Sequence, residues 1–320
     1  MIVITGAAGF IGSCFVSKLN QLGYKDLILV DNFNNLKKKN LDYKRYKKAI
    51  PRDQFLSWFE ENPLLITYVF HLGARTDTTE LDSTIFKELN LNYSKKLWDI
   101  CSNNDIPFFY ASSAATYGIG EFGFADNLEI ISQLRPLNPY GISKNDFDIW
   151  AIKQKEKPSY WIGLKFFNVY GPNEYHKGRM ASVIYHSYQQ IKKNGEMQLF
   201  RSHKDEYKDG EQLRDFIYVK DITEVLAFLL ENRIPNSIYN LGSGVERSFN
   251  DLVKSVFVSI KKKVQIKYID IPLDIRESYQ YFTKAQMTKL QEAGYNNAFT
   301  SLEDGIFDYV TGYLSKNKYY

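Results

Sequence analysis

A tyrosine and a lysine, Tyr140 and Lys144, stand four residues apart in a segment that we expect to be helical. Residues at this spacing lie on the same helix face about one turn apart, so the phenol and the ammonium should be neighbours. A phenol titrates near ~10 in water and needs a nearby cation to act as a base at neutral pH. The pair could therefore transfer a proton to or from a bound substrate.

Two serines, Ser112 and Ser113, follow Ala111 and the apolar stretch 108–110, which is typical of a buried strand. Hydroxyls at the end of such a strand lie at the carboxyl edge of a parallel sheet, where doubly wound folds bind ligands. Ser113 could hydrogen-bond a substrate alcohol as it becomes a carbonyl. We expect Tyr117 to pack beside this site.

Three glycines, Gly6, Gly9 and Gly12, follow the apolar stretch 1–5 and open a segment expected to be helical as far as Leu22. Glycines in this position let backbone N–H groups approach the pyrophosphate of a dinucleotide, and the helix dipole favours its negative charge. The spacing is the variant seen in short-chain dehydrogenase/reductase folds. A glycine triplet alone also occurs in tight turns without a ligand, so its strand-to-helix context carries the prediction.

The residues after the second predicted strand, 27–30, favour two different cofactors. Asp31 could accept hydrogen bonds from the adenosine ribose, which indicates NAD. Asn32 follows immediately, and Lys37–Lys39 and Arg52 could neutralise a 2′-phosphate, which indicates NADP. The residues themselves leave this choice open.

The elements that must position these groups form an α/β pattern. Apolar strand candidates alternate with segments of helical periodicity, which predicts a parallel sheet covered by helices on both faces, wound as a Rossmann-type doubly wound fold. The later candidates are 68–70, 108–110, Trp161 to Val169 and 238–241.

The pattern changes beyond Gly171–Pro172, where we expect a helix from about Ser182, a strand over 197–200 and a surface loop from Arg201 to Gln212. Ser248 with Asp251, and Thr300 with Glu303, have the spacing of helix capping boxes. We predict a dinucleotide-binding Rossmann domain formed by 1–168 and 213–243. A smaller, discontinuous α/β substrate domain would comprise 169–212 and 244–320.

The composition is that of a globular protein that binds a small molecule. The 320 residues are 44% hydrophobic and 24% charged, and the formal net charge is only +4, which argues against nucleic acid as a partner. Two cysteines make a disulfide framework improbable and favour a reducing compartment. No apolar run suits a membrane span, and nothing indicates a metal site, so we expect a soluble, cytoplasmic protein.

The chain resembles the extended short-chain dehydrogenases/reductases, and among them most closely the ADP-glyceromanno-heptose 6-epimerases of lipopolysaccharide core synthesis. The motifs that carry the resemblance run nearly from end to end. They are His71–Ala74 with Thr78–Glu80, Tyr110–Gly118, Phe167–Pro172, His176–Gly178 with Met180–Val183 and His186, Arg214–Val219, and Tyr279–Gln280 with Phe282–Thr283.

The resemblance implies an isomerase that inverts C6 of ADP-D-glycero-D-manno-heptose through a transient 6-ketone, with no net redox change. Tyr140 and Lys177 would be the acid/base groups on opposite faces of the carbon. Lys144 would hold Tyr140 and the nicotinamide ribose, and Ser113 would assist. The family commonly prefers NADP, with NAD as the alternative here, and we expect a homo-oligomer.

The resemblance also implies two sets of binding residues. Those for the cofactor are Gly6, Gly9, Phe10, Ile11, Gly12, Asp31, Asn32, Lys38, Arg52, Leu72, Gly73, Ala74, Asn90, Tyr140, Lys144, Val169 and Lys177. Those for the nucleotide sugar are Ser113, Asn168, Arg179, His186, Phe200, Arg214 and Tyr279.

Two departures bear on the substrate. Arg179 stands where the family usually has a small serine, and the loop from Arg201 to Gln212 is longer than expected. A nucleotide-sugar 4-epimerase would use Ser113, Tyr140 and Lys144 equally well, and Lys177 distinguishes the two readings. A 4,6-dehydratase is disfavoured because Ala114–Ala115 replaces its Asp–Glu pair. A silent dinucleotide-binding regulator would have no need of the catalytic residues together.

Overall fold

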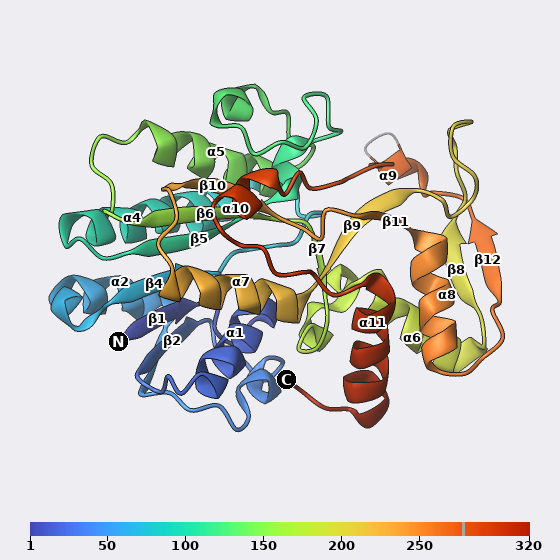
Figure 1. Cartoon of the computed structure of the whole chain (residues 1–320), viewed down its shortest axis with the longest axis horizontal. Helices are drawn as coiled ribbons and strands as arrows, with labels where there is room; N and C mark the ends of the chain where they lie inside the picture. The colour runs from blue at the N-terminus through green and yellow to red at the C-terminus, as the bar shows by residue number, and fades with distance from the viewer. Residues whose placement is uncertain (277–278) are drawn as a thin grey trace.

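A seven-stranded parallel sheet forms the centre of the structure, a computed structural model that describes residues 1–276 and 279–320 (Figure 1). Its strands lie in the order β10-β6-β5-β4-β1-β2-β3, so the direction of winding reverses between β1 and β4. The predicted Rossmann-type doubly wound fold is confirmed. The strands are β1 (Ile2–Thr5), β2 (Leu27–Asp31), β3 (Lys48–Pro51), β4 (Tyr68–His71), β5 (Phe108–Ser113), β6 (Trp161–Phe166) and β10 (Ser237–Leu241).

Helices cover both faces of this sheet because alternate strand residues point to opposite sides. Ile2 and Ile4 pack with α1 (Phe10–Gln21) and α7 (Val219–Glu231) in one core cluster. Val3 packs in another cluster, which includes side chains of the helices on the opposite face. Those helices are α2 (Arg52–Glu61), α4 (Tyr93–Asn103) and α5 (Pro139–Lys153).

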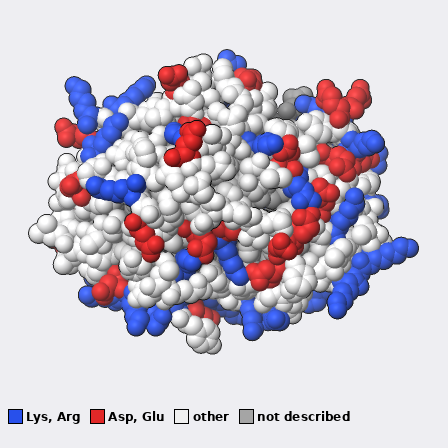
Figure 2. Space-filling view, in the orientation of Figure 1, with Lys and Arg blue, Asp and Glu red and all other residues white. Residues whose placement is uncertain are grey.

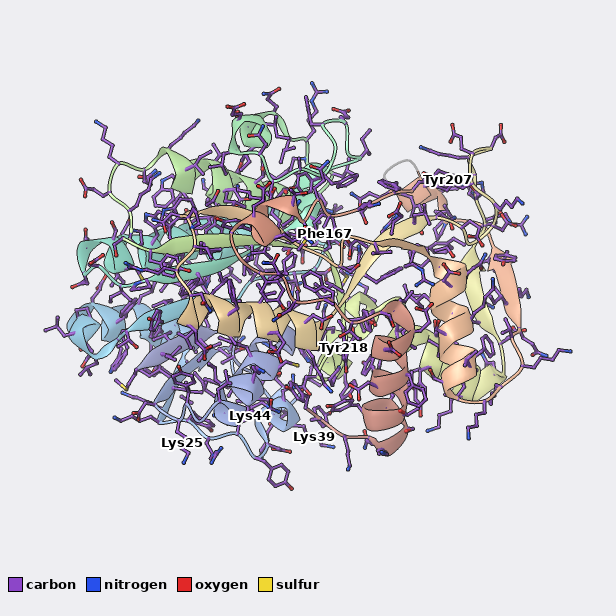
Figure 3. All side chains as sticks on the ribbon, in the orientation of Figure 1. Lys25, Lys39, Lys44, Phe167, Tyr207 and Tyr218 are labelled. Carbon is purple, nitrogen blue, oxygen red and sulfur yellow. The ribbon has the colours of Figure 1, made fainter. Side chains whose placement is uncertain are left out.

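Two smaller sheets lie at the other end of the molecule (Figure 1), one of order β11-β9-β7 and one that pairs β12 with β8. A third core cluster packs their strands against helices there. The division of the chain into two domains stays a prediction. Phe167, labelled in Figure 3, lies where the chain leaves the large sheet. The elements are β7 (Asn168–Tyr170), β8 (Met197–Phe200), β9 (Leu213–Tyr218), β11 (Glu246–Ser248), β12 (Ile266–Ile269), α6 (Val183–Asn194), α8 (Phe249–Ser259) and α11 (Leu302–Phe307).

Short helices complete the described part of the chain. The α-helical ones are α3 (Ser83–Phe86), α9 (Leu273–Arg276) and α10 (Thr288–Glu292). The 3-10 and π segments are η1 (Lys38–Leu41), η2 (Pro63–Leu65), η3 (Lys87–Asn92), η4 (Ala114–Tyr117), η5 (Leu128–Gln133), η6 (Tyr175–Met180), η7 (Asp308–Tyr313) and η8 (Leu314–Lys316). Over the residues that the structure describes, no helix combines the length and the apolar character that crossing a bilayer requires.

One strand prediction was wrong. The stretch Trp161 to Val169 is not one strand but two, β6 and β7, which belong to different sheets. The amide of Val169 donates to the carbonyl of Phe167 at 3.0 Å. This tight turn redirects the chain from the large sheet to the three-stranded one.

One of the two predicted capping boxes was also wrong. Ser248 and Asp251 form the predicted box at the start of α8. At α11 the cap is Ser301, whose hydroxyl accepts from the amide of Asp304. The Thr300 hydroxyl instead donates to the carboxylate of Asp221 at 2.7 Å. The stretch from Arg201 to Gln212 contains no helix or strand, as predicted.

Candidate functional site

The glycine turn lies at the carboxyl edge of the large sheet, between β1 and α1. Gly6 has a φ of +67°, and a Cβ placed on it would lie 2.7 Å from the Cα of Gly73. The turn after β1 and the loop after β4 therefore touch backbone to backbone, at the point where the winding of the sheet reverses. The helix α1 begins at Phe10 with no side-chain cap. Its first N–H groups are thus available to a pyrophosphate, and the turn fits a dinucleotide.

Asp31, at the end of β2, is buried and already has two partners. Its carboxylate accepts a hydrogen bond from the amide of Ala8 at 2.9 Å and an ion pair from Lys37 Nζ at 2.7 Å. Asn32 and Lys38 are exposed on the loop that follows. Arg52 begins α2, directly after β3, the neighbour of β2 in the sheet. Lys37, which pairs with Asp31, is thus the cation beside the expected ribose position.

The loop Leu72–Ala74 follows β4, and Asn90 fastens it to the helix α5. The Asn90 side chain accepts from the amide of Arg75 at 2.8 Å and donates to the hydroxyl of Ser143 at 3.0 Å. Ser143 in turn donates to the carbonyl of Tyr140 at 2.7 Å. Asn90 therefore acts as a structural tie between the β4 loop and the start of α5.

Tyr140 and Lys144 lie one turn apart on α5, whose N-cap is Asn138. Lys144 is buried, and its ammonium donates to the carbonyl of Ala111 at 2.8 Å. Burial lowers the pKa of Lys144 to about 8, and the negative charge of Asp148 opposes that shift. Burial raises the pKa of Tyr140, and a hydrogen bond with the Ser113 side chain opposes the rise. The structure therefore brings Ser113, Tyr140 and Lys144 together.

His71, at the end of β4, lies close to this group as a neutral ring. Its two nitrogens lie 2.7 Å from Thr5 Oγ1 and 2.8 Å from Ser94 Oγ. Burial, and then the charge of Lys144, lower its pKa to about 3. His71 thus supports the β1–β4 edge of the site and does not titrate near neutral pH.

Lys177 lies on η6, beside the glycine turn. Its Nζ atom is 5.3 Å from the centre of the Phe10 ring, at the first residue of α1. Burial lowers the pKa of Lys177, and the carboxylate of Glu174 opposes the shift. Glu174 is itself buried and accepts from the hydroxyl of Ser182 at 2.6 Å. An amine with a lowered pKa beside the cofactor turn is suited to exchanging a proton.

One amide joins the Lys177 segment to the cofactor turn. Asn40 Nδ2 lies 2.9 Å from the carbonyl of Ala8, 3.1 Å from that of Asn173 and 3.2 Å from Nδ1 of His176. Asn40 and Glu174 were not predicted from the sequence. Asn40 ends a lysine run typical of a solvated surface, and Glu174 belongs to no pattern that predicts a role.

Arg179 forms an ion pair with an acidic residue between β4 and α3. Its guanidinium pairs with the carboxylate of Asp77 at 3.1 Å and is 67% exposed. The neighbouring Met180 contacts Thr78, whose hydroxyl lies 3.9 Å from its sulfur. The segment that carries Lys177 is therefore fastened to the loop that follows β4.

Three of the remaining predicted sugar-nucleotide residues lie on strands of the smaller sheets, His186 lies on α6, and Tyr279 lies outside the helices and strands. Arg214 is buried, 5.5 Å from the centre of the Tyr279 ring, and burial lowers its pKa. The rings of Phe200 and Tyr279 are 5.9 Å apart. The structure thus brings Phe200, Arg214 and Tyr279 into one cluster, which Gln280 joins to the β5 side by donating to the carbonyl of Gly118. Asn168 donates to the carbonyl of Asp215 at 3.1 Å, beside Val169 in β7, and His186 lies on α6.

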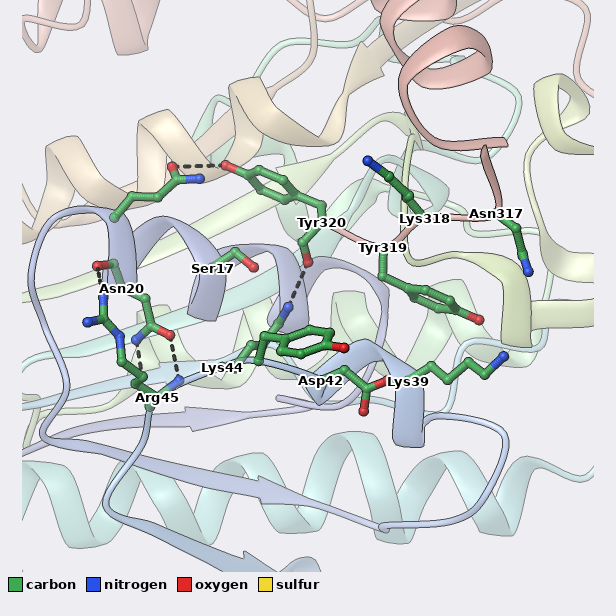
Figure 4. Close-up of a pocket in the computed structure, with 12 residues that line it drawn as sticks. Ser17, Asn20, Lys39, Asp42, Lys44, Arg45, Asn317, Lys318, Tyr319 and Tyr320 are labelled. Atoms are coloured by element: carbon green, nitrogen blue, oxygen red, sulfur yellow. Dashed lines mark hydrogen bonds between the residues drawn. The ribbon is translucent and has the colours of Figure 1, made fainter. Parts of the chain in front are cut away.

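A pocket of about 620 Å³ opens elsewhere, between α1, the stretch 39–45 and the last residues of the chain (Figure 4). Lys44 crosses it and donates to the carbonyl of Tyr320 at 2.6 Å. None of the predicted site residues, all of which are described, lines it. Basic and acidic groups are interspersed on the face shown in Figure 2, in keeping with the small net charge.

Residues 2–242 match the NAD dependent epimerase/dehydratase family. The chain belongs to this family. It is 47% identical to the ADP-L-glycero-D-manno-heptose-6-epimerase of Fusobacterium nucleatum, with all of both chains covered. It also resembles the solved structure of the Helicobacter pylori enzyme of that name, with a TM-score of 0.80 and 27% identity over 97% of this chain and 95% of that one. MoeE5, solved with UDP-glucuronic acid and NAD, has a TM-score of 0.74 and 25% identity over 95% and 96% of the two chains.

Membership in this family makes the carboxyl edge of the large sheet the site of interest. A nicotinamide dinucleotide is the cofactor for which the family is named. The glycine turn, Asp31 and the β4 loop would hold it, and the Tyr140–Lys144 pair lies at the same sheet edge. Ligand binding at this edge is the general rule for open α/β sheets.

Proposed function

We propose that this protein is an isomerase that interconverts ADP-D-glycero-D-manno-heptose and ADP-L-glycero-D-manno-heptose by inverting C6, for the synthesis of lipopolysaccharide inner-core heptose. The observation that carries the proposal is the 47% identity, over whole chains, to an enzyme named for that product. The grouping of Ser113, Tyr140 and Lys144 supports it, because that set can take a proton from an alcohol and return it.

The proposed roles rest on the likeness to enzymes of that name, and the surroundings of each side chain support them. A bound nicotinamide would supply reversible hydride transfer with C6, so that the sugar passes through a 6-ketone. Tyr140 exchanges the hydroxyl proton on one face, aided by the ammonium of Lys144 and the hydroxyl of Ser113. Lys177 exchanges the proton on the other face. Two proton-exchanging groups are needed because each face of the planar ketone requires its own.

We also propose which residues bind the ligands. The glycine turn, Asp31, the β4 loop and Lys144 hold the dinucleotide, and Arg214 contacts the diphosphate of the substrate through its planar guanidinium. We favour NADP over NAD because Lys37 pairs with Asp31 beside the ribose position. We place the reaction in the cytoplasm, which the two free, buried cysteines, Cys14 and Cys101, support.

The test is to incubate the purified protein with ADP-D-glycero-D-manno-heptose, with no cofactor added, and to follow the C6 proton by NMR. Conversion to the L-glycero form is expected and would also show a retained cofactor. Tyr140→Phe should reduce turnover roughly 10²–10⁴-fold, because the proton exchange is lost. Conversion of UDP-glucose to UDP-galactose in place of the heptose reaction would assign the protein to the 4-epimerases.

A further inference from the structure

One ion pair lies completely buried beneath the Tyr140–Lys144 pair. Asp148 of α5 and Lys165 of β6 are 2.7 Å apart, and both side chains are fully buried. Among the ion pairs within residues 1–276 and 279–320, it alone has no exposure on either side. A buried pair of charges is costly to desolvate and adds little net stability compared with apolar side chains. Its presence therefore calls for an explanation other than stability.

Asp148 joins the catalytic helix to the strand that ends at Ser113. Its carboxylate accepts hydrogen bonds from the hydroxyl of Ser112 at 2.7 Å and from that of Tyr110 at 3.1 Å, both in β5. These contacts fix α5 against β5 at the residue immediately before Ser113.

Lys165 extends the same network to the turn beyond Ser113. Its ammonium donates to the hydroxyl of Thr116 at 2.7 Å, and that hydroxyl donates to the carbonyl of Ser113 at 2.8 Å. The ammonium also lies 5.2 Å from the centre of the Tyr117 ring. Ser113 is thus held on both sides by groups that depend on the buried pair.

Asp148 also acts on the site through its charge. Tyr140, Lys144 and Asp148 follow one another at intervals of four residues, and so lie along one face of α5. The Asp148 carboxylate raises the pKa of Lys144 and that of Tyr140. The other groups that face Lys144 are the neutral His71 of β4 and the carbonyl of Ala111 in β5.

We propose that Asp148 and Lys165 are positioning residues for the reaction: they set the distance between the Tyr140–Lys144 helix and Ser113, and they tune the electric field at the phenol. This inference rests on the proposed function for its kinetic consequences. Its electrostatic consequence concerns Tyr140 alone and holds for any substrate.

The test uses Asp148→Asn, alone and combined with Lys165→Met. The single variant leaves the Lys165 ammonium buried without its counter-charge, so it is expected to unfold at a lower temperature than wild type. The double variant removes both charges and should recover most of that loss. Asp221→Asn is the matched control, because Asp221 is a buried carboxylate that accepts from Thr300, outside this network.

Two readouts separate positioning from a merely structural role. With the ADP-heptose, the folded double variant should show kcat lower by roughly ten- to a hundredfold and KM within about threefold of wild type. Without any sugar, the tyrosinate absorbance of each protein, minus that of the same protein carrying Tyr140→Phe, reports the Tyr140 titration. In Asp148→Asn, which removes the Asp148 charge and keeps the Lys165 ammonium, that titration should move to lower pH.

The outcomes are distinct. An active wild type whose double variant has unchanged kcat, together with an unshifted Tyr140 titration in Asp148→Asn, would overturn the inference. If wild type fails to convert the ADP-heptose, the proposed function is wrong, and the Tyr140 titration alone decides the inference. Asp221→Asn should leave both the kcat and the titration at their wild-type values.

Discussion

At the residue scale, two opposing effects set the pKa values of the two site lysines. Burial lowers the pKa of Lys144 and that of Lys177, and the charge of a nearby carboxylate, Asp148 for the first and Glu174 for the second, opposes each shift. Neither opposing carboxylate was predicted from the sequence. Asp148 and Glu174 each lie within four residues of the lysine whose pKa they raise. Only the fold, however, shows that each carboxylate shares a buried environment with its lysine.

The role of Lys177 is tested by Lys177→Met, which keeps the length of the side chain and removes its amine. We expect kcat to fall roughly 10²–10⁴-fold because one face of the ketone loses its proton exchange. Cofactor binding, followed by nicotinamide fluorescence, should persist. Lys192→Met is the control, since Lys192 is an exposed lysine of α6. Wild-type turnover by Lys177→Met would assign the second proton exchange to another group.

The pKa of Lys144 predicts a pH dependence. Below about pH 8 the buried side chain carries a positive charge, and as pH rises through about 8 this charge is lost. In the proposed mechanism this charge stabilises the Tyr140 phenolate. We therefore expect kcat to decline above about pH 8. Lys144→Arg should retain its charge at higher pH, and its kcat should fall less steeply there. An identical alkaline decline in both proteins would exclude Lys144 as its cause.

At the element scale, the proposed dinucleotide site depends on the contact between the glycine turn and the loop that follows β4. Local patterns predicted this part well, because strand alternation, glycine turns and helix caps depend on neighbouring residues. The contact between Asn40 and His176, and that between Asp148 and Lys165, join segments that only the crossovers of the sheet bring together. Spacing along the chain carries no information about such contacts. The turn at Phe167 was not predicted because apolar residues stand on both sides of it, Phe166 before it and Val169 after it.

Gly6→Ala tests the close approach of the two loops. The new Cβ would require a left-handed alanine and would lie 2.7 Å from the Gly73 backbone. We expect the free energy of unfolding to fall by about 2–4 kcal/mol and cofactor binding to be lost. Gly23→Ala is a matched control, because Gly23 has a φ of +93° with no atom within 4 Å of an added Cβ. In Gly23→Ala the free energy of unfolding should fall only by the cost of a left-handed alanine, and cofactor binding should be unchanged.

At the scale of the whole molecule, the proposed cofactor site draws on the large sheet, whereas Phe200 and Arg214 lie on strands of the smaller sheets. A substrate bound between the Tyr140–Lys144 pair and Arg214 would therefore connect the two regions. The expected homo-oligomer is a separate prediction, which analytical ultracentrifugation of the full chain tests.

Cofactor preference can be measured on the stability of the whole protein. A ligand that binds only the folded state stabilises it by about 2.7 kcal/mol at a hundred times its Kd. We expect NADP to raise the unfolding midpoint of the cofactor-free protein more than NAD does at equal concentration. Lys37→Met should reduce this difference, and Lys263→Met, a substitution at an exposed lysine, should not. A larger effect of NAD on the wild type would reverse the assignment.

The amide of Asn40 has a consequence for how such a protein diverges. Because one side chain links the cofactor turn to the segment around His176, the stretch between β2 and that amide could change in length and charge without breaking this link. Selection could thus change the preferred dinucleotide through this stretch. The segment that carries Lys177, the proposed second proton-exchanging residue, would keep its position.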